Sequence, residues 1–384
     1  MSQATVGILG GGQLARMLAL AGAPLGLRLL VLDNLADACA AQVAPLLKAD
    51  FRDADALARF AERIDVATFD FENVPADSAQ WLAARIPVHP SPAALAVAQD
   101  RLAEKSLFLD LGIATPRFSA VASRVDLDRA LADIGAPAIL KTRRLGYDGK
   151  GQFRLRDESD ADAAWAALGA QCDQVGLILE AFVEFRRELS VIAVRGRDGE
   201  FRTWPLTRNW HLDGILCASL APARVNDALA ARAEDSARRI AEALDYVGVF
   251  ALELFDAGDG LLANEMAPRV HNSGHWTIEA AACSQFENHL RAILGLPLGS
   301  TAARGVACML IWVGELPDPT PLLRRPGGHW HDYGKPPRPG RKVGHATVVA
   351  DSEADLAGQL AAYARDSGLE TMIAPVLAAL RGEG

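Results

Sequence analysis

The order of apolar and polar positions over about the first 90 residues predicts strands that alternate with helices. Apolar runs indicate strands at residues 5–9, 28–32 and 67–71, and amphipathic stretches indicate helices at 13–23, 53–63 and 76–85. Such alternation is typical of a parallel α/β sheet. Pro87, Pro90 and Pro92 then interrupt the pattern, so we expect a first domain over residues 1–95.

Strand-like runs dominate the next part of the chain. They cover residues 138–144, 152–156, 177–180, 188–194, 201–205 and 215–220. Asp148-Gly149 lies between the first two runs and is a strong hairpin signal. A helix is predicted at 101–111, and Asn226 can cap a longer amphipathic helix. Short strands at 307–313, 329–332 and 345–349, followed by a helix from about residue 353, predict a small β-rich domain over residues 301–384.

Composition excludes several classes of protein. No apolar run approaches the roughly 20 residues of a membrane span, so no membrane partner is expected. The N-terminus runs straight into a predicted strand, which argues against a signal peptide. A net charge of −9 argues against nucleic acid as the main partner. The five cysteines are scattered without metal-ligand spacing, which favours reduced thiols in a cytoplasm.

Two acidic residues lie on runs that predict neighbouring strands. Glu253 belongs to the apolar run that starts at residue 249, and Glu265 follows a turn at 259–260. Carboxylates on adjacent strands can hold Mg²⁺ between them. Asn264 precedes the second glutamate, and Arg269, His271 and Asn272 follow it as polar donors. So many polar side chains between a strand and an apolar helix predict a functional site.

Two glycine-rich turns are candidates for phosphate binding. The first, Gly10-x-Gly12 with Asp33 after the next strand, satisfies a dinucleotide-binding pattern, but it also fits a simple tight turn or another phosphorylated substrate held at Gln13-Leu14. The second turn, residues 146–152, follows Lys141 and contains Lys150. Alone it reads as an ordinary hairpin, whereas a downstream acid pair for Mg²⁺ favours a nucleoside triphosphate.

Three further segments carry weaker signals. Glu180 ends a strand-like run and begins an apolar segment that can receive adenine or lie in a core, while Glu188 can bind a ribose or be solvated. His211 lies in a polar cluster at 207–214, between predicted strands, and is a candidate for ligand contact. Arg341-Lys342 concentrates positive charge in an acidic protein, and such a pair can bind one phosphate.

The order of these parts resembles the ATP-grasp ligases, in which two subdomains close on ATP. Four segments, at 12–17, 209–216, 269–277 and 338–345, look more narrowly like the 5-(carboxyamino)imidazole ribonucleotide synthase family. The resemblance covers nearly the whole chain, and the last two segments are highly specific. It implies an N-terminal α/β domain, an ATP-grasp domain over 96–300 with a hairpin lid at about 115–185, and a β-rich C-terminal domain.

The resemblance also implies a reaction and a set of site residues. ATP hydrolysis would be coupled to carboxylation of aminoimidazole ribonucleotide by bicarbonate in purine synthesis, with one or two Mg²⁺ ions for which Mn²⁺ can substitute. Relatives of this kind are commonly dimers, so a homodimer is expected. The implied ATP contacts are Arg101, Lys141, Gly146, Tyr147, Asp148, Gly149, Lys150, Gly151, Gln152, Glu180, Ala181, Phe182, Val183, Glu188, His211, Asn264 and Glu265.

The remaining implied roles belong to the metal, bicarbonate and the ribonucleotide. Glu253 and Glu265 would ligate Mg²⁺. Bicarbonate and its phosphorylated form would be surrounded by Arg269, His271, Asn272 and Ser273. The ribonucleotide would meet Gln13, Leu14, Glu72, Tyr147, Asp148, Arg341 and Lys342. Asp148 or His271 would assist deprotonation of the amine.

Other functions fit parts of the same pattern. Another ATP-grasp ligase, such as a formate-dependent glycinamide ribonucleotide transformylase or a biotin carboxylase, would share the ATP residues but not the acceptor pocket. An NAD-dependent oxidoreductase would use the turn at Gly10. A non-catalytic nucleotide sensor is a third class, and the intact set of Glu253, Asn264 and Glu265 argues against it.

Overall fold

The computed structural model describes residues 4–146, 150–258 and 260–383. Its N-terminal part is a parallel sheet in the order β3-β2-β1-β4, as the alternating pattern predicts. The strands are β1 (Thr5–Leu9), β2 (Arg28–Asp33), β3 (Leu46–Lys48) and β4 (Val66–Phe69), and the first helices are α1 (Gln13–Gly22), α2 (Ala54–Ala61) and α3 (Ala76–Ala83). Two helices, α4 (Pro92–Ala98) and α5 (Arg101–Asp110), lead out of this sheet. Neither β3 nor α4 was expected from the sequence.

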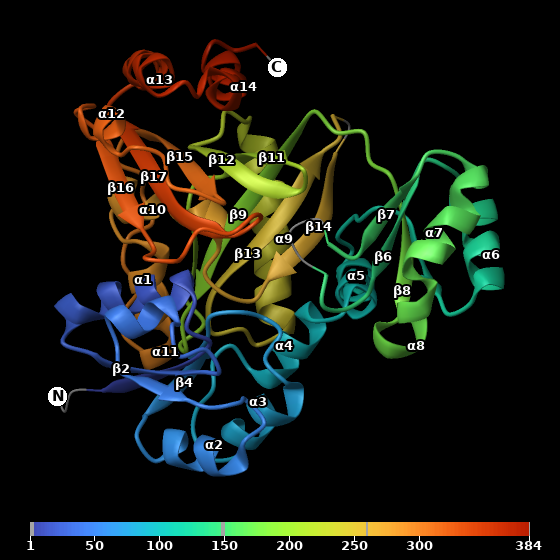
Figure 1. Cartoon of the computed structure of the whole chain (residues 1–384), viewed down its shortest axis with the longest axis horizontal. Coiled ribbons are helices and arrows are strands. Elements are labelled where there is room, and N and C mark those ends of the chain that lie inside the picture. Colours follow the sequence, from blue (N-terminus) through green and yellow to red (C-terminus); the bar gives the residue numbers. More distant parts are fainter. Residues whose placement is uncertain (1–3, 147–149, 259, 384) are drawn as a thin grey trace.

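A second sheet stands apart from the rest of the molecule and is called the lid sheet here (Figure 1). Its strands pair in the order β5-β8-β6-β7. They are β5 (Phe118–Val121), β6 (Ala138–Thr142), β7 (Gln152–Leu155) and β8 (Leu177–Ala181), with helices α6 (Arg124–Ile134), α7 (Ala161–Leu168) and α8 (Cys172–Val175). The antiparallel pairing of β6 with β7 confirms the predicted hairpin. Buried leucines from both the strands and the helices give this sheet its own core.

The third sheet has nine strands within the described part of the chain and is called the main sheet. Its path runs β14-β13-β9-β11-β12-β15-β17-β16, with β10 paired to β9. The strands are β9 (Arg187–Arg195), β10 (Phe201–Thr203), β11 (Thr207–Leu212), β12 (Ile215–Ala221), β13 (Gly248–Asp256), β14 (Leu261–Ala267), β15 (Val306–Val313), β16 (Gly328–Asp332) and β17 (Lys342–Ala350). The placement of residues 207–214 between strands was wrong, because residues 207–212 form β11 and pair on both sides.

The helices of the second half cover the main sheet. They are α9 (Asp227–Ala243), α10 (Thr277–Ala280), α11 (Gln285–Leu294), α12 (Thr320–Leu323), α13 (Glu353–Ser367) and α14 (Glu370–Leu380). Asn226 caps α9 as predicted, since its side chain accepts a hydrogen bond from the Leu229 N–H at 2.8 Å. The strands on both sides of the boundary expected at residue 300 belong to one sheet through the pairing of β12 with β15. The division at 95 and 300 stays a prediction.

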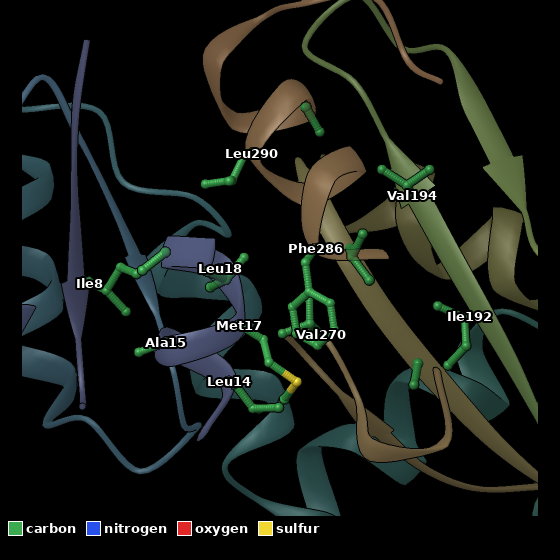
Figure 2. Close-up of a cluster of buried hydrophobic side chains, with 14 of the residues drawn as sticks. Ile8, Leu14, Ala15, Met17, Leu18, Ile192, Val194, Val270, Phe286 and Leu290 are labelled. Atoms are coloured by element: carbon green, nitrogen blue, oxygen red, sulfur yellow. The ribbon is translucent and has the colours of Figure 1, made fainter. Parts of the chain in front are cut away.

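The N-terminal sheet is fixed to the main sheet by helix packing. Figure 2 shows Leu14, Met17 and Leu18 on one side of α1, with Phe286 and Leu290 of α11 beside them. These side chains share one buried cluster with Ile192 and Val194 of β9. Burial of this apolar surface holds the start of α1 near the first residues after β14. Among the residues that the structure describes, no helix is both long and apolar enough to cross a membrane.

Candidate active site

The two predicted metal-binding glutamates lie directly opposite each other on β13 and β14. The Cα atoms of Glu253 and Glu265 are partners in the antiparallel ladder, so their side chains project from the same face of the sheet. The register then shifts, because Leu254 pairs with Ala263 and leaves Asn264 as an extra residue in β14. This β-bulge brings Asn264 to the same cavity as the two glutamates.

One face of α5 holds the bulged segment with three charged side chains. The contacts are Arg101 Nη1 to Glu265 Oε2 at 2.6 Å, the Met266 N–H to Glu104 Oε1 at 2.6 Å, and Lys105 Nζ to the Asn264 carbonyl at 3.1 Å. Positions 101, 104 and 105 share one helical face because they are three and four residues apart. The helix therefore fixes three consecutive residues of β14.

The charges between α5 and β14 shift the pKa values of Glu104 and Glu265. Burial and the neighbouring charge of Glu265 raise the pKa of Glu104 to about 8. Burial alone would raise the pKa of Glu265 as well, but Arg101 and Lys141 outweigh it and lower that pKa to about 2. Glu265 is therefore ionised at neutral pH and available to a cation.

A buried ion-pair network connects α5 to the lid sheet. Glu180 Oε2 on β8 accepts a hydrogen bond from Lys141 Nζ at 2.9 Å and lies 3.3 Å from Lys105 Nζ. Glu180 and Lys105 are almost fully buried. Burial alone would raise the pKa of Glu180, but the two lysines and Arg101 lower it to about 2. The carboxylate thus holds Lys141 in place beside the cavity.

The segment after β14 adds a second ion pair and an imidazole. Arg269 Nε donates to Glu72 Oε2 at 2.5 Å, which links this segment to the N-terminal sheet. Burial alone would raise the pKa of Glu72, and the Arg269 guanidinium outweighs it and lowers the pKa. His271 Nε2 lies 3.1 Å from Glu253 Oε1. A cation, an imidazole and a carboxylate are therefore placed next to the acid pair.

These groups line one cavity of about 700 Å³ between the three sheets. The predicted site residues that line it are Gln13, Leu14, Glu72, Arg101, Lys141, Gly146, Gln152, Glu188, His211, Glu253, Asn264, Glu265, Arg269, His271, Asn272 and Lys342. Its volume is in the range of small-molecule sites. Within the part of the chain that the structure describes, no three His, Cys, Asp or Glu side chains gather as a metal cluster. A cation here would rely on the acid pair and neighbouring oxygens.

Other predicted residues lie elsewhere. Tyr147, Asp148 and Gly149 fall outside the described residues, so their predicted roles stay predictions. The predicted residues that lie outside the cavity wall are Lys150, Gly151, Glu180, Ala181, Phe182, Val183, Ser273 and Arg341. Ser273 is fully buried behind His271, and its hydroxyl lies 2.8 Å from His271 Nδ1. The Arg341 guanidinium donates to the Pro336 carbonyl at 3.3 Å.

The segment at residues 181–183, which follows Glu180 and is called the hinge here, has two backbone N–H groups engaged within the protein. The Ala181 N–H donates to the Arg117 carbonyl and the Phe182 N–H to the Pro137 carbonyl. The Phe182 ring lies 4.0 Å from the Arg154 guanidinium. Two of the three hinge amides are therefore already engaged, and adenine binding by this segment stays a prediction.

The turn at Gly10 does not support the dinucleotide reading. Asp70, directly after β4, accepts hydrogen bonds from the N–H groups of Gly12 and Ala15. A side chain at position 12 would collide with that carboxylate, so the close approach requires glycine. Asp33 accepts from the Gly11 N–H at 2.6 Å. Carboxylates thus occupy the helix N-terminus that a pyrophosphate would need.

His211 and Glu188 form a pair on the wall of the cavity. His211 Nδ1 on β11 lies 2.6 Å from Glu188 Oε2 on β9. Burial alone would lower the pKa of His211, but the Glu188 carboxylate outweighs it and raises the pKa. Phe185 and Phe255 stack nearby with ring centroids 4.8 Å apart and also line the cavity. The cavity wall near His211 therefore combines an aromatic surface with hydrogen-bonding groups.

Sequence reasoning missed several residues of the site. Lys335 donates a hydrogen bond to Gln13 Oε1 at the start of α1, and burial lowers the pKa of its ammonium group. Asp70 lines the cavity at the end of β4. The position of Asp70 directly after a strand was a usable signal, whereas Lys335 lies in a proline- and glycine-rich segment with no pattern around it. Glu104 and Lys105 were also missed.

Comparison with known proteins places this cavity in a family. Three family profiles match the chain in order: a ribonucleotide synthetase preATP-grasp domain at residues 3–99, an ATP-grasp domain at 106–286 and a phosphoribosylaminoimidazole carboxylase C-terminal domain at 307–359. The N5-carboxyaminoimidazole ribonucleotide synthase of Pseudomonas aeruginosa is 52% identical over 356 residues, which are 93% of this chain and 97% of that protein.

Solved structures agree in fold over nearly the whole chain. The N5-carboxyaminoimidazole ribonucleotide synthetase of Thermus thermophilus superposes with a TM-score of 0.89 at 54% identity, covering 94% of this chain and 98% of that one. The Aspergillus clavatus synthase, solved with ADP and 5-aminoimidazole ribonucleotide, has a TM-score of 0.85 at 31% identity and covers 99% of both chains. With its parallel N-terminal sheet, lid sheet and bulged acid pair, this chain belongs to the N5-carboxyaminoimidazole ribonucleotide synthase family.

Proposed function

We propose that this chain catalyses the ATP-dependent carboxylation of 5-aminoimidazole ribonucleotide by bicarbonate in purine biosynthesis. The products are ADP, phosphate and 5-(carboxyamino)imidazole ribonucleotide, formed through carboxyphosphate. The names of the relatives, and the two ligands of the Aspergillus structure, support this choice of substrates. The observation that carries the proposal is one cavity that joins Glu253 and Glu265 to Lys141 of the lid sheet and Lys342 of β17.

Mg²⁺ fits the oxygen atoms that face each other at the bulge. Glu253 and Glu265 supply carboxylates from opposite positions, and the buried Asn264 Oδ1 has no hydrogen-bond partner among the described residues. Hard oxygen donors of this kind suit Mg²⁺ or Mn²⁺, and one or two ions are expected. When bound, the metal neutralises the triphosphate charge and polarises the phosphoryl group.

Several of the ATP residues predicted from the sequence line the cavity near the acid pair. Arg101 and Lys141 carry the positive charge that the phosphates need, and their positions are set by Glu265 and Glu180. Glu188 with His211 provides hydrogen-bonding groups for a ribose. The side chains of Ile139, Phe255 and Met266 supply apolar surface for a base.

We place bicarbonate and the ribonucleotide at the end of the cavity near Arg269 and His271. Bicarbonate is a poor electrophile, and phosphoryl transfer from ATP gives it a good leaving group. Arg269, His271 and Asn272 lie next to Glu253, where fixed donors can stabilise the charge that develops during this transfer. The amine of the ribonucleotide then attacks the carboxyl carbon, a C–N bond forms as the C–O bond to phosphate breaks, and the amine proton passes to a base, for which Asp148 stays a predicted candidate.

The ribonucleotide phosphate requires a positively charged subsite. Lys342 of β17 lines the cavity, and Lys335, in the connection between β16 and β17, donates a hydrogen bond to the cavity residue Gln13. Together with the expected Arg341 they provide point charges and a guanidinium for one phosphate. Tyr147 and Asp148 stay predicted contacts of the ribonucleotide. A cytoplasmic homodimer also stays a prediction from the sequence.

Phosphate release with different substrate pairs tests the proposal. We expect ATP-dependent release with aminoimidazole ribonucleotide and bicarbonate, and none above background with glycinamide ribonucleotide and formate. With ¹⁸O-labelled bicarbonate, ¹⁸O should appear in the released phosphate, because carboxyphosphate carries a bicarbonate oxygen to phosphorus. Turnover of the second pair would assign the chain to a different ligase, and unlabelled phosphate would exclude carboxyphosphate.

A further inference from the structure

A chain of buried hydrogen bonds runs through the main sheet to the cavity wall at His271. Its links are Ser219 Oγ to Asn209 Oδ1 at 2.7 Å, Asn209 Nδ2 to Ser190 Oγ at 3.0 Å, Ser190 Oγ to Ser273 Oγ at 2.8 Å, and Ser273 Oγ to His271 Nδ1 at 2.8 Å. None of the five residues is more than 8% exposed. They come from β12, β11, β9 and the turn after β14, so the chain crosses the sheet.

The direction of one hydrogen bond to His271 is fixed. The Ser273 backbone N–H lies 3.4 Å from His271 Nδ1 and donates to it, and an amide N–H cannot accept a hydrogen bond. His271 Nδ1 is therefore an acceptor and carries no proton. The Ser273 hydroxyl, 2.8 Å from the same nitrogen, must also donate to it.

The directions of the other hydrogen bonds follow from the acceptor at His271 Nδ1. Since the Ser273 hydroxyl donates to the imidazole, it accepts from the Ser190 hydroxyl. Ser190 in turn accepts from the Asn209 amide, and the Asn209 carbonyl accepts from Ser219. Only this order satisfies all the links at once, because each hydroxyl has a single proton to donate.

The order determines which imidazole nitrogen carries the proton. A neutral imidazole has one N–H, and an accepting Nδ1 leaves it on Nε2. His271 Nε2 faces Glu253 Oε1 at 3.1 Å, and the residue lines the cavity. An N–H beside a carboxylate is attractive, whereas a nitrogen lone pair there would be repelled. His271 thus presents a hydrogen-bond donor.

We propose that Ser190, Asn209 and Ser219 are positioning residues that act through Ser273 to hold His271 as its Nε2–H tautomer. In this form His271 donates a hydrogen bond to an oxygen of bicarbonate or carboxyphosphate and does not accept the proton of the amine. The identity of that anion rests on the proposed function, whereas the tautomer does not. A donor whose direction is fixed in advance stabilises developing negative charge without reorganisation.

The tautomer can be observed directly by NMR. The full-length protein is labelled with ¹⁵N-histidine, and long-range ¹H–¹⁵N spectra are recorded without substrates. The signal of His271, one of eight histidines, is assigned by its loss in His271→Asn. We expect Nε2 to be protonated and Nδ1 to be an unprotonated, hydrogen-bonded nitrogen. A protonated Nδ1 in the wild-type protein would overturn the inference.

A substitution in the middle of the hydrogen-bond chain tests whether its residues position His271. Asn209→Leu keeps the branching of the side chain at Cγ and removes the link between Ser219 and Ser190. The Ser273 hydroxyl is then no longer held as a donor, and only the longer contact of the Ser273 N–H, at 3.4 Å, remains at Nδ1. Both imidazole nitrogen shifts should therefore move toward the average of two exchanging tautomers, and KM for bicarbonate should rise about tenfold while KM for ATP stays unchanged. The matched control is Asn288→Leu, because Asn288 is also fully buried and, among the described residues, its side-chain amide bonds to the backbone of Gly299 alone.

The outcomes separate this inference from the proposed function. If Asn209→Leu has the same imidazole shifts and the same KM for bicarbonate as Asn288→Leu, the positioning role is overturned. Because the spectra are recorded without substrates, a wrong tautomer overturns the inference even in an active carboxylating enzyme. An expected tautomer in a protein that does not carboxylate overturns only the proposed function.

Discussion

Glu265 accepts a hydrogen bond from Arg101 and is a proposed ligand of the metal beside the triphosphate. Glu265→Gln keeps the shape of the side chain but removes a full negative charge next to the transferred phosphoryl group. We expect turnover to fall by at least about 100-fold, comparable with the loss of one strong electrostatic group in an active site. ADP release measures the effect, and Glu242→Gln on the exposed face of α9 is the control. Near-normal turnover of Glu265→Gln would contradict the metal role.

Lys342 tests the opposite end of the cavity. Lys342→Ala should raise KM for aminoimidazole ribonucleotide about 10- to 100-fold, which corresponds to losing one charge-assisted hydrogen bond of about 1.5–3 kcal/mol. KM for ATP should not change, because Arg101 and Lys141, the residues proposed to bind its phosphates, lie on α5 and the lid sheet. Steady-state kinetics with each substrate varied in turn gives both constants, and Lys48→Ala on β3 is an exposed control. A rise confined to ATP would show that Lys342 has been placed wrongly.

At the scale of residues, the sequence predicted those site residues whose spacing has a specific chemical explanation. Glu253 and Glu265 could be predicted because two carboxylates on adjacent strand-like runs have few structural uses. Lys105 could not, because a lysine on a short helix usually lies in solvent, and only the fold reveals that it is fully buried. The tautomer of His271 depends on residues from four segments, which no local pattern brings together.

At the scale of elements, α5 acts as a support for the bulged strand. Lys105→Met preserves the buried length of the side chain but removes the contacts of Nζ with Glu180 and with the Asn264 carbonyl. We expect the free energy of unfolding to fall by about 1–3 kcal/mol, the cost of leaving a buried polar group unsatisfied. Turnover should fall as well, because Asn264 and Glu265 lose part of their support.

Urea unfolding and ADP release measure these two effects of Lys105→Met. Lys48→Met, at an exposed position on β3, is the matched control and should change neither quantity. If Lys105→Met unfolds at the same urea concentration as the wild type and turns over normally, Lys105 does not support the bulged strand.

The ion pairs of Glu180 predict a pH dependence of stability. Its folded-state pKa is about 2, below the ordinary value of 4.5, so the pairs stabilise the fold above pH 4.5 and this contribution is lost as the pH falls toward 2. Glu180→Gln lacks this contribution at every pH. The difference in free energy of unfolding between wild type and variant should therefore narrow by about 2 kcal/mol between pH 7 and pH 3. A constant difference in urea unfolding over this range would contradict the ion-pair assignment.

Helices and strands were predicted correctly where the sequence signal lies within a few residues. The hairpin of β6 and β7 and the start of α9 were predicted correctly, because a turn sequence and a capping residue act within a few positions. Strand β11 was missed because polar residues interrupt it, and one of them, Asn209, belongs to a buried hydrogen-bond chain that only the neighbouring strands create. The bulge at Asn264 is likewise a property of the pairing between β13 and β14.

At the scale of the whole molecule, three sheets contribute to one cavity. The N-terminal sheet brings Gln13, the lid sheet brings Lys141, and β17 of the main sheet brings Lys342. The fold class and the three regions could be predicted from periodicity and resemblance. The continuous pairing from β14 to β16 could not, because strands such as β12 and β15 are separated by a long stretch of chain and pair through contacts that leave no local pattern.

The docking of α1 on α11 is what brings the N-terminal sheet to the cavity, and Leu290→Ala tests it. Leu290 is fully buried beside α1, and its truncation should lower the free energy of unfolding by about 2–5 kcal/mol. Looser docking displaces Gln13 and Leu14, so KM for the ribonucleotide should also rise severalfold while KM for ATP stays unchanged. Leu360→Ala on α13 is the matched control, because it truncates an equally buried leucine in a different cluster. It should cost similar stability without affecting KM for either substrate. Equal changes in both KM values for Leu290→Ala would show that the docking acts on the site as a whole rather than on the ribonucleotide end.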